Sequence, residues 1–179
     1  MIFSPSTLPG VWSIAPERHE DERGYFARTY CAREFAEHGL DPQLVQHSLS
    51  YNRRRGTLRG MHFQAPPHAE NKIVTCSRGE IYDVVLDLRA QSPAFGRWTA
   101  FTLSADNGEA VFIPAGCAHG FITLADATTV RYDISAYHVP EAARGVRFDD
   151  PAFAIAWPLA PAVISERDLA FPPFAAPER

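Results

Sequence analysis

Short runs of β-branched and aromatic residues, each followed by a turn-forming group, recur through the middle of the chain and limit what it can fold into. The runs cover residues 72–76, 80–89, 98–103, 110–113, 120–124 and 128–137. The groups between them are rich in glycine and proline, as at Gly79, Ser92-Pro93, Asp106-Asn107-Gly108 and Pro114-Ala115-Gly116. Many short strands with such turns are typical of a β-sandwich or barrel. The sequence therefore predicts an all-β fold.

Few segments outside these strands have a helical pattern. One or two short helices are expected, and the clearer one covers residues 32–39, where Gly39 would end it. From Pro158 onward the chain is rich in proline and alanine, and we expect this tail to pack across the outside of the barrel. The 179 residues suit one domain with a substantial core, and no linker divides them. We therefore expect a single domain over residues 1–179.

The charge, hydropathy and cysteines of the chain argue against several classes of protein. The net charge is −4 and basic residues form no long run, so a nucleic-acid-binding face is not expected. No apolar run approaches the roughly 20 residues of a membrane span, and the first residues lack the pattern of a signal peptide. Three cysteines without close spacing favour reduced thiols. We expect a cytoplasmic protein that binds neither nucleic acid nor membrane.

The segment from Leu58 to Gln64, followed by Lys72, groups three chemically useful side chains in what otherwise resembles a buried strand. The His62 imidazole suits proton abstraction near neutral pH. The Lys72 ammonium can hold the negative charge that abstraction creates, and the Arg59 guanidinium suits a phosphate. This combination indicates an enzyme that moves protons on a phosphorylated carbonyl compound.

Strand alternation predicts which of these side chains face inward. Lys72 shares a strand face with Val74, and Tyr132 shares one with Val130, so both lie on apolar faces and would point into a barrel. Arg59 and His62 differ in parity along their strand, so we expect a bulge at Gly60 that re-aims one of them.

The segment from Gly108 to Phe121 matches the second sequence motif of the cupin barrels. A metal-binding cupin would have a second histidine two residues after His62, where this chain has Gln64. A transition metal needs three or four ligands, and only His62 and His119 are plausible here. We therefore expect no metal and no cofactor. His119 either braces its turn or contacts a substrate, and we expect Asp83 and Asp87 to form internal salt bridges, with Arg89 or Arg59 as partner.

Several segments, in one order along most of residues 20–168, carry a specific resemblance. They are residues 21–26, 58–64, 72–74, 79–84, 87–89, 92–93, 103–104, 113–121, 149–151 and 155–158. Together they resemble the dTDP-4-dehydrorhamnose 3,5-epimerase family, of which the chain would be a divergent member. The resemblance implies a cupin-like jelly roll, a homodimer and metal-independent chemistry.

The resemblance also implies a reaction and a role for each site residue. Members of the family act on a 4-keto-6-deoxy sugar carried by a nucleoside diphosphate: a base removes the proton at C3 or C5, and an acid reprotonates the opposite face. His62 matches the base, Tyr132 the acid, and Asp168 the carboxylate that pairs with the histidine. Lys72 matches the residue beside the ketone. The positions that correspond to substrate contacts are Arg23, Arg28, Gln46, Ser48, Arg59 and His119.

Departures from the family pattern leave parts of the function open. Arg28 and Ala143 stand where the family commonly has glutamate. Ser48 stands where it commonly has asparagine, and Asp133 where it commonly has lysine. The base and the acid are kept while the nucleotide-recognition positions differ, so the nucleotide, the sugar and the number of inverted carbons stay open. The alternatives are a 3,4-ketoisomerase on the same kind of substrate, a non-catalytic sugar-nucleotide-binding cupin and a metal-dependent cupin.

Overall fold

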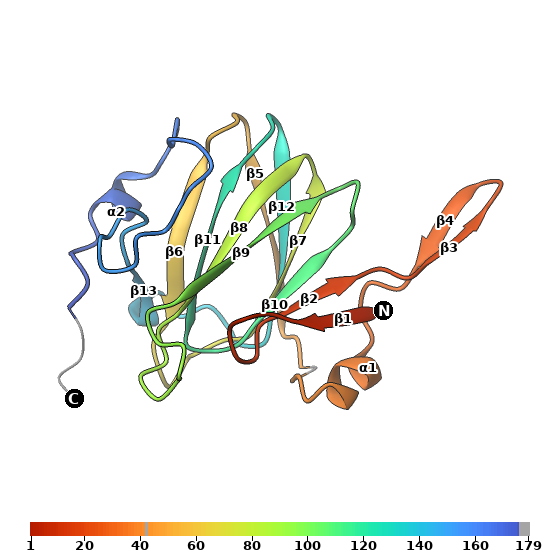
Figure 1. Cartoon of the computed structure of the whole chain (residues 1–179), viewed down its shortest axis with the longest axis horizontal. Coiled ribbons are helices and arrows are strands. Elements are labelled where there is room, and N and C mark those ends of the chain that lie inside the picture. Colours follow the sequence, from red (N-terminus) through yellow and green to blue (C-terminus); the bar gives the residue numbers. More distant parts are fainter. Residues whose placement is uncertain (42, 176–179) are drawn as a thin grey trace.

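Two antiparallel sheets face each other in the computed structural model, which describes residues 1–41 and 43–175 (Figure 1). In the larger sheet the strand order is β1 (Ile2–Pro5), β2 (Trp12–Ala15), β10 (Ala110–Ile113), β7 (Lys72–Arg78), β12 (Thr128–Ile134) and β5 (Gln46–Asn52). In the smaller sheet it is β13 (Ala143–Gly145), β6 (Leu58–Gln64), β11 (Cys117–Thr123), β8 (Glu80–Asp87) and β9 (Trp98–Ser104). From β5 onward the chain crosses between the sheets at almost every step, so the expected cupin-like jelly roll is confirmed.

The remaining elements lie at the margins of the two sheets. Strands β3 (Arg18–Asp21) and β4 (Gly24–Ala27) form a hairpin that projects away from the body, here called the arm (Figure 1). Helix α1 (Ala32–Glu37) confirms the predicted helix, and α2 (Glu166–Leu169) agrees with the expected one or two short helices, although its position was not predicted. The 3-10 turn η1 (Pro140–Ala142) was not predicted either. Among the described residues, no helix has the length and apolar character needed to cross a membrane.

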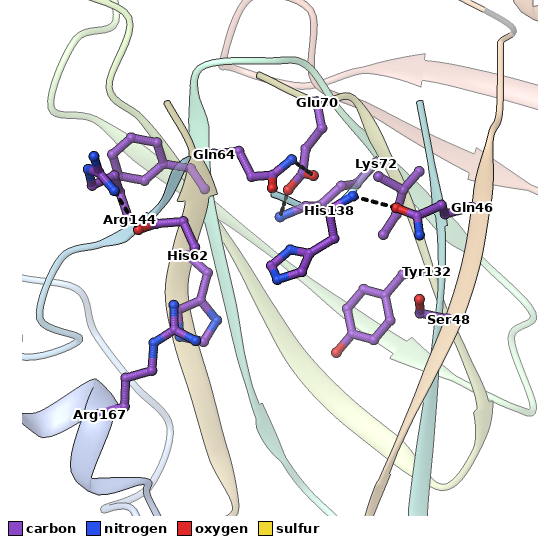
Figure 2. A pocket seen from close by; sticks show the side chains of 13 residues that line it. Gln46, Ser48, His62, Gln64, Glu70, Lys72, Tyr132, His138, Arg144 and Arg167 are labelled. Atoms are coloured by element: carbon purple, nitrogen blue, oxygen red, sulfur yellow. Dashed lines mark hydrogen bonds and ion pairs between the residues drawn. The ribbon is translucent and has the colours of Figure 1, made fainter. Parts of the chain in front are cut away.

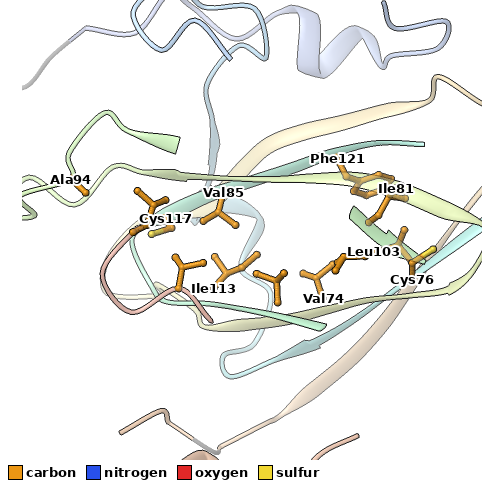
Figure 3. Packing of buried hydrophobic residues seen from close by; sticks show 13 residues of the cluster. Val74, Cys76, Ile81, Val85, Ala94, Leu103, Ile113, Cys117 and Phe121 are labelled. Atoms are coloured by element: carbon orange, nitrogen blue, oxygen red, sulfur yellow. The ribbon is translucent and has the colours of Figure 1, made fainter. Parts of the chain in front are cut away.

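The main hydrophobic core fills the space between the sheets (Figure 3). Val74 and Val130 enter it from the larger sheet, and Ile81, Val85 and Phe121 enter it from the smaller one, each at most 1% exposed. Burying one such side chain contributes about 1.5–3 kcal/mol to stability. The alternation predicted for β7 and β12 is therefore confirmed, and it leaves Lys72 and Tyr132 on the inner face.

An extra residue in β6 bends the strand at Gly60. His62 pairs with His119 of β11, but Arg59 pairs with Phe121, so three steps on β6 match two on β11. Residues two apart on β11 share a face, and their partners Arg59 and His62 therefore share that face as well. The predicted bulge is confirmed. Gly60 has φ +130°, and a Cβ there would lie 2.4 Å from Cα of Gly120.

The C-terminal segment runs along the outside of β6, as predicted for the tail. Thr57 pairs with Val163 in a short parallel bridge, and the Leu58 N–H donates to the Val163 carbonyl at 2.8 Å. This contact brings α2 against β6 at the bulge (Figure 1).

Replacing Gly60 by alanine should destabilise the fold, because the new methyl group would overlap the backbone of β11. We expect a loss of about 1–3 kcal/mol in the free energy of unfolding beyond that of Gly24→Ala, measured by urea denaturation. Gly24 is the matched control, since it has φ +118° but nothing within 4 Å of an added Cβ. Equal losses for the two variants would show that the close approach at Gly60 is unimportant for stability.

Candidate active site

A cavity of about 280 Å³ lies between the two sheets, where side chains from β5, β6, β7 and β12 converge (Figure 2). It brings together five of the residues predicted from sequence, namely Gln46, Ser48, His62, Lys72 and Tyr132. A second cavity of about 320 Å³ adjoins it and is lined by Arg59 and Asp168. His62 and Arg167 line both cavities, so the two form one continuous candidate site.

His62 is held by a buried carboxylate from the C-terminal segment. Its Nε2 lies 2.7 Å from Oδ1 of Asp168, whose side chain is 4% exposed. Asp168 also accepts from the Gly60 N–H at 3.2 Å, so the bulge and the histidine share one anchor. Burial alone would raise the pKa of Asp168, but the hydrogen bond and charge of His62 and the Gly60 N–H hold it below its usual value. An ionised Asp168 only accepts, which leaves Nε2 as the donor and Nδ1 of neutral His62 free to take a proton.

Lys72 is paired with a carboxylate that was not predicted from the sequence. Its Nζ lies 2.8 Å from Oε1 of Glu70, and the two side chains are only 12% and 9% exposed. Gln64 donates to the other oxygen of Glu70, also at 2.8 Å. Gln64, interpreted from sequence only as a missing metal ligand, therefore helps to orient the lysine.

Tyr132 lies across the cavity from His62, on the opposite sheet (Figure 2). Burial raises the pKa of its hydroxyl to about 12, a bond of 3.2 Å with Ser50 opposes the rise, and the charge of Asp83 adds to it. Tyr132 is therefore a neutral phenol across the ordinary pH range and has a proton to give.

Arg59 lies at the rim of the site. It is exposed, and its Nε donates to Oδ1 of Asn52 at 2.8 Å. Its charge lowers the pKa of Tyr132, which indicates that the guanidinium is near the phenol. The bulge thus brings the Arg59 guanidinium to the same inner face as the His62 imidazole.

His119 does not brace its turn. Its Nε2 lies 2.6 Å from Oδ2 of Asp83 inside the barrel, and its ring centroid is 6.2 Å from that of Tyr132. The arginine partner expected for Asp83 was wrong, because Asp83 and His119 both face inward on neighbouring strands. Asp87 does pair with Arg89, at 2.6 Å, as expected.

Arg23 and Arg28 lie away from both cavities of their own chain. Arg23 stands at the tip of the arm and binds Asp21, and Arg28 follows the arm and bonds Glu34 at 2.8 Å. Their predicted roles as substrate contacts remain predictions.

Three further polar lining residues were missed from sequence: His138, Arg144 and Arg167. Arg167 directly precedes Asp168 in the chain, which was the available signal. In the described part of the chain, no group of three or more His, Cys, Asp or Glu side chains could hold a metal ion.

Comparison with known proteins gives one consistent family. A family model described as dTDP-4-dehydrorhamnose 3,5-epimerase matches residues 5–176. A dTDP-4-dehydrorhamnose 3,5-epimerase of Sinorhizobium fredii is 40% identical, over 96% of this chain and 89% of its own. The crystal structure of the enzyme of that name from Elizabethkingia anophelis superposes with a TM-score of 0.94 at 36% identity, covering 97% of this chain and 96% of its own. A 3′-monoepimerase from Streptomyces bikiniensis, solved with dTDP-quinovose, has a TM-score of 0.87 at 34% identity, over 94% and 86%.

The lowered pKa of Asp168 should be visible in the pH dependence of stability. Its ordinary value is 3.8, so the ionised carboxylate stabilises the fold above about pH 4, and this contribution is lost as the pH falls through the lower folded-state value. We expect Asp168→Asn to cost about 1–3 kcal/mol at pH 5 and less at pH 3, as measured by urea denaturation. The exposed Asp106→Asn is the control and should follow the wild type. A cost for Asp168→Asn that stays constant from pH 5 to pH 3 would contradict the assignment.

Proposed function

The chain belongs to the dTDP-4-dehydrorhamnose 3,5-epimerase family, and from that premise we propose that His62 is its base and Tyr132 its acid. The protein is an isomerase that epimerises a nucleoside-diphosphate 4-keto-6-deoxy sugar at C3, C5 or both. The observation that carries the proposal is the position of the two side chains, which reach into one cavity from opposite sheets.

Proton removal begins at His62. The C4 ketone acidifies the hydrogens on C3 and C5, and Nδ1 of His62 takes one of them. The imidazolium that forms is stabilised by ionised Asp168 at 2.7 Å, as in other histidine–carboxylate pairs. The Asp168 side chain is only 4% exposed, but the His62 side chain is 38% exposed, so solvent on the histidine side screens part of this attraction.

The enolate that results needs a cation at its oxygen, and Lys72 is that cation. Its ammonium is held by Glu70 at 2.8 Å and so has a fixed position before substrate arrives. Tyr132 then gives its proton to the opposite face of the same carbon. The carbonyl returns to C4 and the carbon is inverted.

The cationic side chains next to the base suit the diphosphate. Arg59 and Arg167 both line the second cavity, and a guanidinium can bind phosphate oxygens with two parallel bonds. Gln46 and Ser48 on β5 line the first cavity and would contact the sugar nucleotide there. His119 lines neither cavity, and its role as a substrate contact remains a prediction. We propose thymidine diphosphate as the carrier, supported by the dTDP-sugar in the related monoepimerase.

The arm supports a homodimer. Phe26 on the arm is 75% exposed, and Arg23 and Arg28, which correspond to nucleotide contacts, lie outside the cavities of their own chain. We propose that each arm reaches the site of a partner subunit, where these residues meet the nucleotide. We also propose one domain over residues 1–179 and a cytoplasmic location, the latter supported by free thiols at Cys31, Cys76 and Cys117.

Isotope exchange tests the assignment of base and acid. The protein is incubated with dTDP-4-keto-6-deoxyglucose in deuterated water, and deuterium at C3 and C5 is followed by NMR. We expect His62→Ala to lower the exchange rate by about 10²–10⁴-fold, because the variant lacks the imidazole that takes the proton. We expect Tyr132→Phe to keep exchange while inversion is impaired, because abstraction does not need the phenol.

Two results would sink this assignment: equal exchange by the wild type and His62→Ala, or loss of all exchange in folded Tyr132→Phe. The same spectra test the alternatives. A carbonyl at C3 in the product would indicate a ketoisomerase, and a wild type without any exchange would indicate a binding protein.

A further inference from the structure

The His138 imidazole has no role in the proton transfers proposed for His62 and Tyr132. It lines the same cavity as His62, Lys72 and Tyr132, and its side chain points into that cavity (Figure 2). The residue is exposed, and no hydrogen bond or ion pair of its ring occurs among the described residues. It is therefore both open to solvent and close to the reacting groups.

The loop that carries His138 is held firmly. The His138 N–H donates to Oε1 of Gln46 at 2.5 Å, and the next residue, Val139, donates its N–H to Oε1 of Gln64 at 2.7 Å. Gln64 also donates to the Tyr137 carbonyl at 3.2 Å. Three hydrogen bonds from two strands thus fix the backbone on both sides of the imidazole, which favours a defined position over the cavity.

Each inversion leaves the site in the wrong protonation state for the next one. His62 has gained a proton, and Tyr132 has become a phenolate. With a pKa near 12, caused first by burial, that phenolate is costly in its surroundings and must regain a proton. A proton donor in contact with solvent has to supply it.

The other groups around Tyr132 are poorly suited to this task. Lys72 is bound to Glu70, His119 is 4% exposed and bound to Asp83, and the Ser50 hydroxyl has no proton to spare at neutral pH. Imidazole exchanges protons readily near neutral pH. His138 is the exposed imidazole of the cavity that has no partner in the described residues.

We propose that His138 returns a proton to Tyr132 after each inversion, a role that rests on the proposed function. An N–H bond of the His138 imidazolium breaks, and the O–H bond of Tyr132 forms, directly or through a water in the cavity. Neutral His138 then takes a proton from solvent, while His62 releases its proton to solvent. The cycle balances, because one proton enters and one leaves for each carbon inverted.

The proposal predicts a separation between the first inversion and continued turnover. With enzyme in excess over dTDP-4-keto-6-deoxyglucose, the first inversion uses the proton already on Tyr132. His138→Gln and His138→Phe should therefore leave its rate, followed by rapid quench and NMR, within about threefold of the wild type. With substrate in excess, both variants should be slower by about tenfold or more. Added imidazole should restore this steady-state rate and leave the first inversion unchanged.

His68→Gln is the matched control, because His68 is another exposed histidine on a loop beside Gln64 but does not line the cavity. It should behave as the wild type in both regimes. Equal slowing of both regimes in the His138 variants, no slowing in either, or no response to imidazole would each overturn the proposal. A wild type without exchange at C3 or C5 would instead refute the proposed function itself.

Discussion

The close contact between β6 and β11 at Gly60 is the constraint on which the rest of the site depends. With a Cβ at residue 60, the strands could not approach, since it would lie 2.4 Å from Cα of Gly120. The extra residue accommodated there turns Arg59 and His62 to one face. It also frees the Gly60 N–H to bind Asp168, so one backbone irregularity positions three side chains, those of Arg59, His62 and Asp168.

Paired charges surround the cavity. The carboxylates Asp168 and Glu70 each bond one functional group, namely His62 and Lys72. The Lys72–Glu70 pair is largely shielded from water, whereas the His62 side chain is 38% exposed and only its partner Asp168 is buried. Such pairs cost desolvation energy. Their benefit is a fixed position before substrate binds, together with a fixed positive charge for Lys72 and a fixed tautomer for neutral His62. Tyr132 differs, because burial keeps it neutral and makes it a donor. The groups proposed as base, enolate cation and acid thus have three distinct electrostatic settings within one cavity.

The alternation of apolar and polar residues along the sequence predicted those strands that have one buried face. Strands β7 and β12 were predicted because alternate residues enter the core, and the parity of Arg59 and His62 was enough to predict the bulge. The arm was not predicted, because β3 has no buried face. The bond between His62 and Asp168 joins residues 106 positions apart, so only the family resemblance pointed to it. Glu70 and His138 were missed because their roles arise from loops that come together only in the folded chain.

A crystal structure of the protein with a bound dTDP-4-keto-6-deoxy sugar or a stable analogue tests the central claim most directly. We expect the sugar ring between the two sheets, with the reacting carbon about 3–3.5 Å from Nδ1 of His62 on one face and near the Tyr132 hydroxyl on the other. The C4 oxygen should lie on Lys72. A sugar bound outside this cavity, or with His62 and Tyr132 on the same face of the ring, would contradict it.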